Sequence, residues 1–315
     1  MEPNEGRFIM TRISRLGLFT IFIVCLGTGV PAALAQDSSV VVLNKDPQLV
    51  PKRLSSTGDS MTEAIDAELP DANHWASWAN GYHGFWQWLF CLTDVNSHNQ
   101  RITRNFGKGG RKNYMEAVSG ADMFDFPWQA RQAVDHRAQY VTVLLGHNDV
   151  CQNDFADIPT DKDFEVSFRA GMEILKAGLP VGATVYVVSI VDIHRLWEIA
   201  RHKKALGIVD CEVLWAFTLV DLFPCGTMLS PFISEADRLY TRSRNIAFNS
   251  ILERVTAEYD ARDAHHHYLY TDAVFHYPFV ESQVSDIDCF HPSAPGQKEL
   301  SRITWNAGPF KEFQK

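Results

Sequence analysis

Near-continuous apolar runs alternate with segments of helical periodicity along most of this chain. Residues 140–145 and 184–191 carry mostly β-branched and aliphatic side chains at successive positions, the pattern of a strand buried on both faces. Residues 234–259 instead place apolar side chains at helical spacing, as at Phe248, Leu252 and Val255. The whole pattern predicts strands at 52–57, 101–105, 140–145, 184–191 and 268–270, and helices at 75–90, 127–137, 163–177, 234–259 and 295–305.

Strands that alternate with helices predict an α/β fold, a three-layer α/β/α sandwich around a mainly parallel, five-stranded sheet. In such sheets, functional sites gather beyond the carboxyl ends of the strands. Ser60, Gly110 and Asn148 each come shortly after a predicted strand. These three residues are therefore expected at one shared site.

The start of the chain has the layout of a secretory signal. Within residues 11–35, Arg12 and Arg15 precede an apolar run at 16–26, and small residues at 33–35 offer a cleavage site. Residues 1–35 are thus expected to be a signal peptide, with Met10 as an alternative initiator to Met1. Residues 36–52 are expected to form a loose leader, and residues 53–315 a single domain with an insertion near 195–232.

The net charge of the chain and the length of its apolar run at 16–26 limit the kinds of partner that are expected. Cleavage after Ala35 removes two acidic and three basic residues, which takes the net charge from −9 to −10. An acidic exported domain without a basic cluster argues against nucleic acid and anionic membrane surfaces as partners. The apolar run of the signal is too short for a stable membrane span. The mature protein is therefore expected to be periplasmic or extracellular.

Five cysteines remain after signal cleavage, namely Cys91, Cys151, Cys211, Cys225 and Cys289. Export permits disulfides, and the odd number leaves at least one thiol without a partner in the chain. Cys211 and Cys225 lie in the same long insertion and are the expected pair. One or two bridges are expected in all.

A serine near the start of the domain is matched by an acid–base pair near its end. Ser60 lies in a Gly-Asp-Ser turn, and Asp288 and His291 are spaced so that both side chains can lie on one side of a turn. A serine hydroxyl becomes a good nucleophile when a base takes its proton and an acid holds that base in one tautomer. The N–H groups of Ser60 and Gly110 and the amide of Asn148 are candidate oxyanion donors. Taken by itself, each of these motifs has a purely structural interpretation, as an ordinary turn or a helix cap.

Four blocks of the chain resemble those of the SGNH (GDSL-type) hydrolase superfamily: residues 58–60, the glycine at 110, residues 146–149 and residues 288–291. The resemblance covers residues 53–306. It implies a flavodoxin-like sandwich and an ester hydrolase without a metal or other cofactor. Ser60 would be the nucleophile, His291 the base, Asp288 its partner, and Gly110 and Asn148 oxyanion donors. Residues 146–151 and 288–293 further resemble the phospholipase-B-like branch, whereas the polar strand at 55–57 departs from the family pattern.

The expected function is an exported serine esterase or lipase that cleaves carboxylic esters through an acyl-enzyme. The substrate is a small-molecule, lipid or acyl-sugar ester, and a soluble ester is favoured because no sustained apolar surface segment is evident. One alternative is an acyltransferase or deacetylase that uses the same residues on acylated carbohydrate. A second is a non-catalytic carbohydrate-binding protein on a hydrolase scaffold. The oligomeric state is not indicated.

Two further clusters have a structural and a functional interpretation. Seven aromatic residues between 75 and 90 are expected in the core of a helix, with a substrate cleft as the alternative. Residues 265–267 are three successive histidines, and neighbours on an extended chain point to opposite faces. A solvated turn is therefore favoured there over a metal site.

Overall fold

A five-stranded sheet organises the chain in the computed structural model, which describes residues 44–217 and 224–313. The predicted signal peptide and residues 36–43 of the predicted leader lie outside these residues. The strand order is β2-β1-β3-β4-β7, and every neighbouring pair is parallel. The strands are β1 (Arg53–Gly58), β2 (Lys112–Met115), β3 (Tyr140–Leu144), β4 (Thr184–Val188) and β7 (His267–Thr271). A separate antiparallel hairpin joins β5 (Lys204–Ala205) to β6 (Val209–Asp210).

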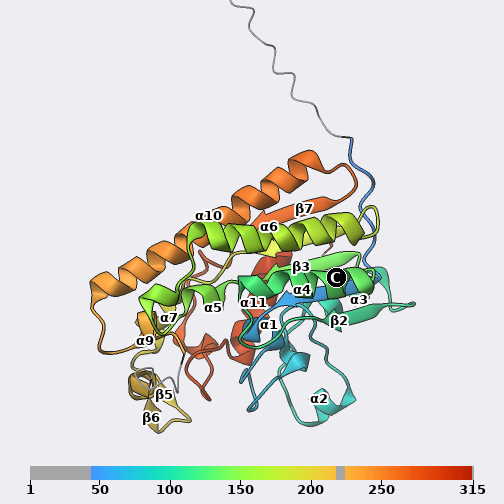
Figure 1. Cartoon of the computed structure of the whole chain (residues 1–315). Helices are drawn as coiled ribbons and strands as arrows, with labels where there is room; N and C mark the ends of the chain where they lie inside the picture. Colours follow the sequence, from blue (N-terminus) through green and yellow to red (C-terminus); the bar gives the residue numbers. More distant parts are fainter. Residues whose placement is uncertain (1–43, 218–223, 314–315) are drawn as a thin grey trace, which may run out of the picture. The chain divides into compact units, whose positions relative to one another are not determined.

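Helices cover both faces of the sheet, as the apolar pattern predicts. One face packs under α4 (Phe126–Asp135), α6 (Asp161–Gly178) and α10 (Glu235–Arg262), which lie side by side in Figure 1. The other face packs against α3 (His98–Phe106) and α11 (Ala294–Ala307). Side chains alternate between the two layers, because Val141 and Val143 join the first core and Tyr140 and Leu144 the second. The predicted α/β/α sandwich is confirmed.

Two of the three buried polar side chains in the strand that leads to Ser60 are hydrogen-bonded inside the sheet, whereas the Ser56 hydroxyl has no partner among the described residues. Ser55 and Thr57 are fully buried. The Ser55 hydroxyl donates to the Glu116 carboxylate at 3.2 Å, and the Thr57 hydroxyl donates to the carbonyl of Thr142 at 3.0 Å. Buried hydroxyls cost little once hydrogen-bonded. The departure from an aliphatic first strand is therefore compatible with a buried β1.

The strand predicted at 101–105 is wrong, because these residues belong to helix α3. Ser97 caps this helix by accepting from the Gln100 N–H, and the Gln100 side chain in turn accepts from the Ser97 N–H. This reciprocal capping box starts the helix in a sequence whose apolar positions are few. The strand in this part of the sheet is β2, a four-residue edge strand with two exposed residues. Gly110 therefore precedes its neighbouring strand instead of following it.

The helix predicted over 75–90 is also wrong. Only two short pieces are helical, the 3-10 turn η1 (His74–Ala76) and helix α2 (Phe85–Leu89). Gly81 and Gly84 disfavour a helix between them. The Asn80 side chain also donates to Asn113 of β2 at 2.7 Å, which holds this stretch as a loop. The remaining predicted helices are confirmed as α4, α6, α10 and α11, with shifts of one to three residues at their ends.

The shorter helices occupy the connections around the sheet. They are α1 (Ser60–Glu63), α5 (His147–Val150), α7 (Ile193–Ala200), α8 (Cys211–Trp215) and α9 (Gly226–Leu229). Both α1 and α5 begin within three residues of the end of a central strand, β1 and β3 respectively. Among the described residues, no helix combines the length and apolarity that a bilayer crossing requires.

The disulfide connectivity differs from the expected pair. Cys151 bonds to Cys225 and Cys211 to Cys289, so the predicted Cys211–Cys225 bridge is wrong. Each bond joins residues more than 70 positions apart. Cys91 is the one free cysteine among the described residues, and it is exposed.

Candidate active site

The predicted serine, histidine and aspartate form one connected line. The Ser60 hydroxyl lies 2.7 Å from Nε2 of His291, and Nδ1 of His291 is hydrogen-bonded to the Asp288 carboxylate. The same carboxylate accepts the N–H groups of Phe290 at 2.9 Å and His291 at 3.1 Å. With Nδ1 protonated toward Asp288, Nε2 is the acceptor for the serine proton. The fold thus brings together three residues that span more than 230 positions of the chain.

The turn that presents Ser60 is held from several sides. Asp59 caps α1 by accepting the Met61 N–H at 2.9 Å. Gln129 of α4 clamps Gly58, accepting from its N–H at 2.7 Å and donating to its carbonyl at 2.8 Å. Gln297 of α11 donates to the Met61 carbonyl at 2.7 Å. These buried hydrogen bonds fix the backbone on both sides of Ser60.

A second aspartate–histidine pair lies directly behind the serine. Nδ1 of His147 is 2.7 Å from the second oxygen of the Asp59 carboxylate, and both side chains are buried. Nε2 of His147 accepts the Val191 N–H at 3.3 Å, so Nδ1 carries the hydrogen that points to Asp59. This pair links the chain segments that follow β1, β3 and β4. This contact between His147 and Asp59 was not identified from the sequence.

The carboxylates around His291 have opposite shifts. Burial by itself would raise the pKa of Asp288, but the hydrogen bond and charge of His291, with the two backbone donors, lower it. Asp66 is close to both residues, and burial raises its pKa, with the negative charge of Asp288 adding to the rise. Asp288 is therefore the ionised partner of His291, and Asp66 is the more easily protonated neighbour.

The predicted oxyanion donors do not all reach the site. Asn148 borders the same pocket as Ser60, and its amide donates to the Ala121 carbonyl at 2.7 Å. Gly110 lies at the opposite end of the sheet, because the register pairs Lys112 with Arg53 at the start of β1. Since Gly58 is five residues beyond Arg53, Gly110 is separated from the Ser60 turn by roughly 17 Å or more along the strands. Its assignment as a donor has no geometric support.

A different glycine occupies the expected position after β2. The segment beyond this strand runs beside the serine turn, because the Val118 N–H donates to the Gly58 carbonyl at 3.2 Å. Gly120 follows with φ +82°, immediately before the residue that Asn148 contacts. Sequence reasoning missed Gly120 because β2 itself was not recognised. The sequence feature that could have identified Gly120 is its position shortly after a short edge strand that contains a tyrosine.

An apolar pocket opens beside Ser60. It spans about 640 Å³, including space open to solvent, and is bordered by Ser60, His147, Asn148 and His291. Its walls come mainly from α7 and from the segment before His291. The apolar side chains among its lining are Met61, Val191, Ile193, Leu196, Ile199, Phe279, Val284, Phe290 and Pro292. Such a wall suits a hydrocarbon portion of a ligand.

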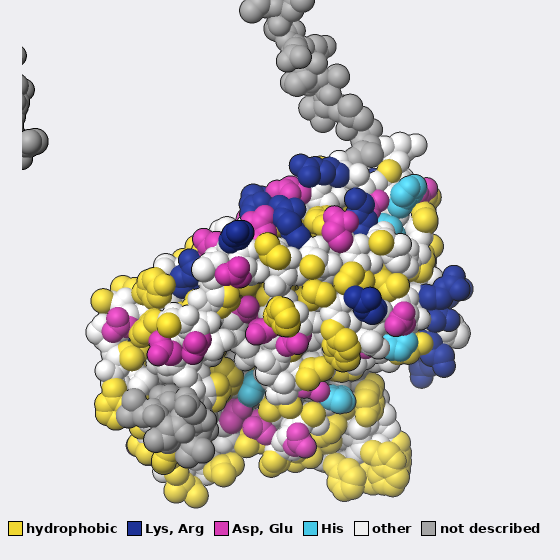
Figure 2. All heavy atoms as spheres, viewed as in Figure 1, with side chains coloured by type: hydrophobic (Ala, Val, Ile, Leu, Met, Phe, Trp, Pro, Cys, Tyr) yellow, Lys and Arg dark blue, Asp and Glu magenta, His cyan; other side chains and the backbone are white. Residues whose placement is uncertain are grey.

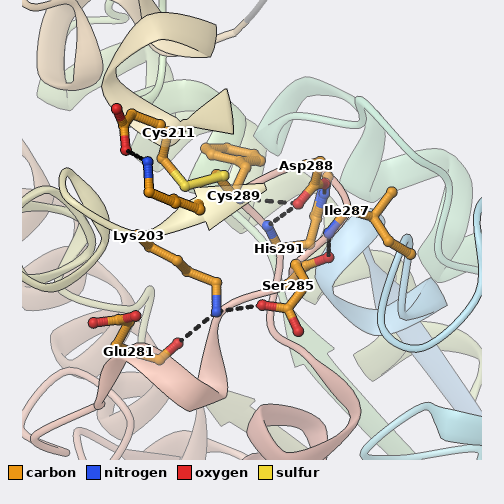
Figure 3. Close-up of a disulfide and its surroundings, with 12 residues drawn as sticks. Lys203, Cys211, Glu281, Ser285, Ile287, Asp288, Cys289 and His291 are labelled. Carbon is orange, nitrogen blue, oxygen red and sulfur yellow. Dashed lines mark hydrogen bonds and ion pairs between the residues drawn. A yellow bond between two sulfur atoms is a disulfide. The ribbon is translucent and has the colours of Figure 1, made fainter. Parts of the chain in front are cut away.

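A disulfide holds the loop that carries Asp288 and His291. Figure 3 shows Cys289 between these two residues and bonded to Cys211 of α8. Cys289 has φ +59°, a conformation that non-glycine residues rarely adopt. Nearby, Lys203 forms an ion pair with Asp286 at 2.6 Å, and the Ser285 N–H donates to the His291 carbonyl at 2.8 Å. The bond and these contacts together fix the strained loop.

The sequence matches the model of the GDSL-like lipase/acylhydrolase family over residues 57–299. The chain belongs to this family. Family membership makes it a carboxylic ester hydrolase of the SGNH superfamily, with small-molecule esters as substrates. No curated protein is similar enough in sequence to count as a match.

Two solved lipase structures are similar over most of the chain but at low identity. The lipase Lip_vut3 from a goat rumen metagenome is 13% identical, with 81% of this chain and 97% of that chain covered and a TM-score of 0.47. An extracellular lipase from Streptomyces rimosus is 15% identical, with 81% and 99% covered and a TM-score of 0.41.

The two disulfides allow a matched test of the strained loop. Cys211→Ser with Cys289→Ser should lower kcat/KM for ester hydrolysis at least about tenfold, because the loop loses its anchor. The pair Cys151→Ser with Cys225→Ser is the control for loop length, since the two bonds close loops of 78 and 74 residues, and Cys151 borders the pocket without belonging to the loop of Asp288 and His291. Both variants should lose about 4 kcal/mol of stability. Equal activity losses in the two folded variants would show that the Cys211–Cys289 bond has no special role at the site.

Buried Asp149 predicts a pH dependence of stability. Burial raises its pKa to about 7, opposed in part by the Met123 N–H, which donates to the carboxylate at 2.8 Å. The folded state therefore holds a proton that the unfolded state releases above about pH 4. Relative to Asp149→Asn, wild-type stability should fall by about 1.4 kcal/mol per pH unit between these two values. Urea unfolding from pH 4 to pH 8 measures this, and parallel curves for the two proteins would contradict it.

Proposed function

We propose that this chain is an exported serine esterase of the lipase type that cleaves carboxylic esters through an acyl-enzyme. The observation that carries the proposal is the unbroken line from Ser60 through His291 to Asp288 at the mouth of an apolar pocket. The membership in an ester hydrolase family supports it independently.

Ser60 is the proposed nucleophile and His291 its base. As the Ser60 oxygen bonds to the ester carbonyl carbon, its proton passes to Nε2 of His291 over the existing 2.7 Å hydrogen bond. Asp288, whose pKa is lowered by its contacts with His291, stays ionised and stabilises the imidazolium. His291 then protonates the leaving alcohol as the carbon–oxygen bond breaks. Water, deprotonated by the same nitrogen, then attacks the acyl carbon. The bond from this carbon to the Ser60 oxygen breaks, the acid leaves, and His291 returns the proton to Ser60.

The oxyanion is proposed to bind the N–H groups of Ser60 and Gly120 and the amide of Asn148. A side-chain amide carries two hydrogens, and one of those on Asn148 is used by the Ala121 carbonyl. That bond orients the amide beside Ser60, and the second hydrogen is assigned to the oxyanion. Gly120 replaces Gly110 in this set, because it follows β2 at the carboxyl end of the sheet. Each such donor contributes about 3 kcal/mol to transition-state stabilisation.

The pocket is proposed to hold the acyl chain of the substrate. Its walls are apolar, and Ser60 and His291 lie at its border. An apolar chain placed there leaves its carbonyl carbon at the serine and its alcohol portion toward solvent. This favours acyl esters over acylated sugars recognised through their hydroxyl groups. The phospholipase-B-like branch is proposed on residues 146–151 and 288–293.

Export is proposed from the signal-like residues 11–35 and from the disulfides. Two disulfides are typical of proteins that fold in an oxidising compartment. The predicted cleavage after Ala35 would free a mature chain that begins at Gln36.

The serine mechanism predicts a complete dependence on Ser60. Ser60→Ala should lower kcat for p-nitrophenyl esters, from acetate to palmitate, at least about 10⁴-fold without loss of stability. The small residue leaves the surrounding hydrogen bonds of Asp59 and Gly58 in place. Substantial activity in this variant would rule out Ser60 as the nucleophile. Absence of any turnover by the wild type would argue against a simple esterase.

Alanine substitutions at two glycines distinguish the two candidate glycine donors to the oxyanion. Gly110 (φ +67°) and Gly120 (φ +82°) both have left-handed backbones, and a Cβ at either would meet no atom within 4 Å. Alanine therefore adds a similar local strain at both positions. Gly120→Ala should lower kcat/KM about tenfold or more by shifting its N–H, while Gly110→Ala stays within about twofold of wild type. The reverse ranking in ester hydrolysis would restore Gly110 as the donor.

A further inference from the structure

Within the described residues, helix α2 and the residue after it carry a run of exposed apolar side chains. Phe85, Trp86, Trp88, Leu89 and Phe90 expose between 46% and 67% of their surface, and no residue of α2 is buried. We call residues 85–90 the aromatic tip. Its rings contact one another, as in the stacked pair of Trp86 and Phe90, and do not enter the core. Such a concentration of exposed rings marks a surface that binds something.

A second apolar projection is the turn of the β5–β6 hairpin. Leu206 and Ile208 are exposed by 69% and 78%, and Val209 next to them is also exposed. We call residues 206–209 the hairpin tip. The hairpin is stapled by the Lys204–Asp210 ion pair at 2.7 Å, and the Leu206 N–H donates to the Asp286 carbonyl at 2.6 Å. These contacts hold the apolar turn outward instead of letting it fold inward.

Both tips lie at the end of the sheet that carries the active site. The aromatic tip belongs to the connection that leaves the carboxyl end of β1 after Ser60, and the hairpin tip to the one that leaves β4. In Figure 1, α2 and the β5–β6 hairpin project at the same end, on either side of α1. The same two places carry hydrophobic surface in Figure 2. Between β4 and the hairpin, α7 contributes Leu196 and Ile199 to the pocket wall.

The charge pattern points to an uncharged surface as the occupant. No Asp, Glu, Lys or Arg occurs from residue 75 to residue 93, and none occurs in the hairpin tip. Tryptophan and phenylalanine favour the boundary between hydrocarbon and water, whereas an anionic bilayer is usually met by lysine and arginine. Two separate tips on either side of one pocket fit a broad, continuous apolar layer better than the shaped surface of one protein. A neutral or zwitterionic lipid surface has these properties.

We propose that the aromatic tip and the hairpin tip together seat this chain on a zwitterionic lipid surface, with the pocket opening toward it. The inference rests on the proposed function and names its substrate class: the acyl esters of aggregated lipid. An acyl chain then passes from the lipid layer into the pocket without crossing water. The preference for a soluble ester, expected from the sequence, is replaced by this proposal.

Binding to phosphatidylcholine vesicles tests the proposal without requiring turnover. The tip variant combines Trp86→Ser, Trp88→Ser and Phe90→Ser. The control combines Trp128→Ser, Val166→Ser and Val181→Ser, which are exposed by 52% to 58% outside both tips. In flotation assays, the tip variant should show an apparent affinity at least about tenfold lower than wild type, and the control should match wild type. Anionic vesicles should bind wild type no better than phosphatidylcholine does.

Activity assays separate this proposal from the proposed function. The tip variant should hydrolyse soluble p-nitrophenyl acetate within about twofold of wild type and vesicle phosphatidylcholine at least about tenfold more slowly. Ser60→Ala should bind vesicles like wild type and hydrolyse neither substrate. Vesicle binding by a wild type that cleaves no ester would overturn the proposed function and leave the docking surface standing. Equal vesicle binding by the tip variant and the wild type would overturn the docking surface. A dimer that forms without lipid in the wild type and the control, and is lost in the tip variant, would also overturn it.

Discussion

The arrangement of the active site depends on one fully buried carboxylate, that of Asp59. A charge without partners in such a place would cost several kcal/mol. Asp59 avoids this by accepting the Met61 N–H and the Nδ1–H of His147, and His147 in turn accepts the Val191 N–H. The segments after β1, β3 and β4 are thereby tied to a single side chain. Ser60 is the next residue, so its position relative to His291 follows from that bond network.

Parallel topology turns this local network into a working site. All five strands end at the same edge, so the connections after β1, β2 and β3 run beside one another there, as the contacts of Val118 with Gly58 and of Asn148 with Ala121 show. The acid–base pair arrives from a loop beyond β7, just before α11. The pocket wall comes from α7 and the segment before His291, so it can change without any change in the core. The scaffold and the substrate preference are therefore separable.

The interior strands of the fold and the edge strand β7 were predictable from the sequence, whereas the other edge strand, β2, was not. Strands β3 and β4 are buried on both faces, and their continuous apolar runs identify them directly. The edge strand β2 has a neighbouring strand on one side only, and its residues Lys112 and Asn113 are exposed. The sequence of β2 therefore lacks the continuous apolar run that identifies a buried strand. The misplacement of Gly110 follows from that single missed strand. Ser60, Asp288 and His291 were found because each lies in a local motif, whereas the Asp59–His147 contact depends on the strand order.

The disulfide pairing could not be predicted from the sequence either, because the fold, and not the spacing of the cysteines along the chain, decides which of them meet.

The Cys211–Cys289 bond has a consequence for the order in which the protein folds and becomes active. The five strands and their flanking helices contain neither Cys211 nor Cys289, so the bond acts on the loop and α8 and not on the sheet itself. In a chain whose cysteines are still reduced, the loop between Asp288 and His291 would lack the covalent anchor of its strained residue. Oxidation would then act as a maturation step, because the loop that carries Asp288 and His291 is covalently held only once the Cys211–Cys289 bond has formed.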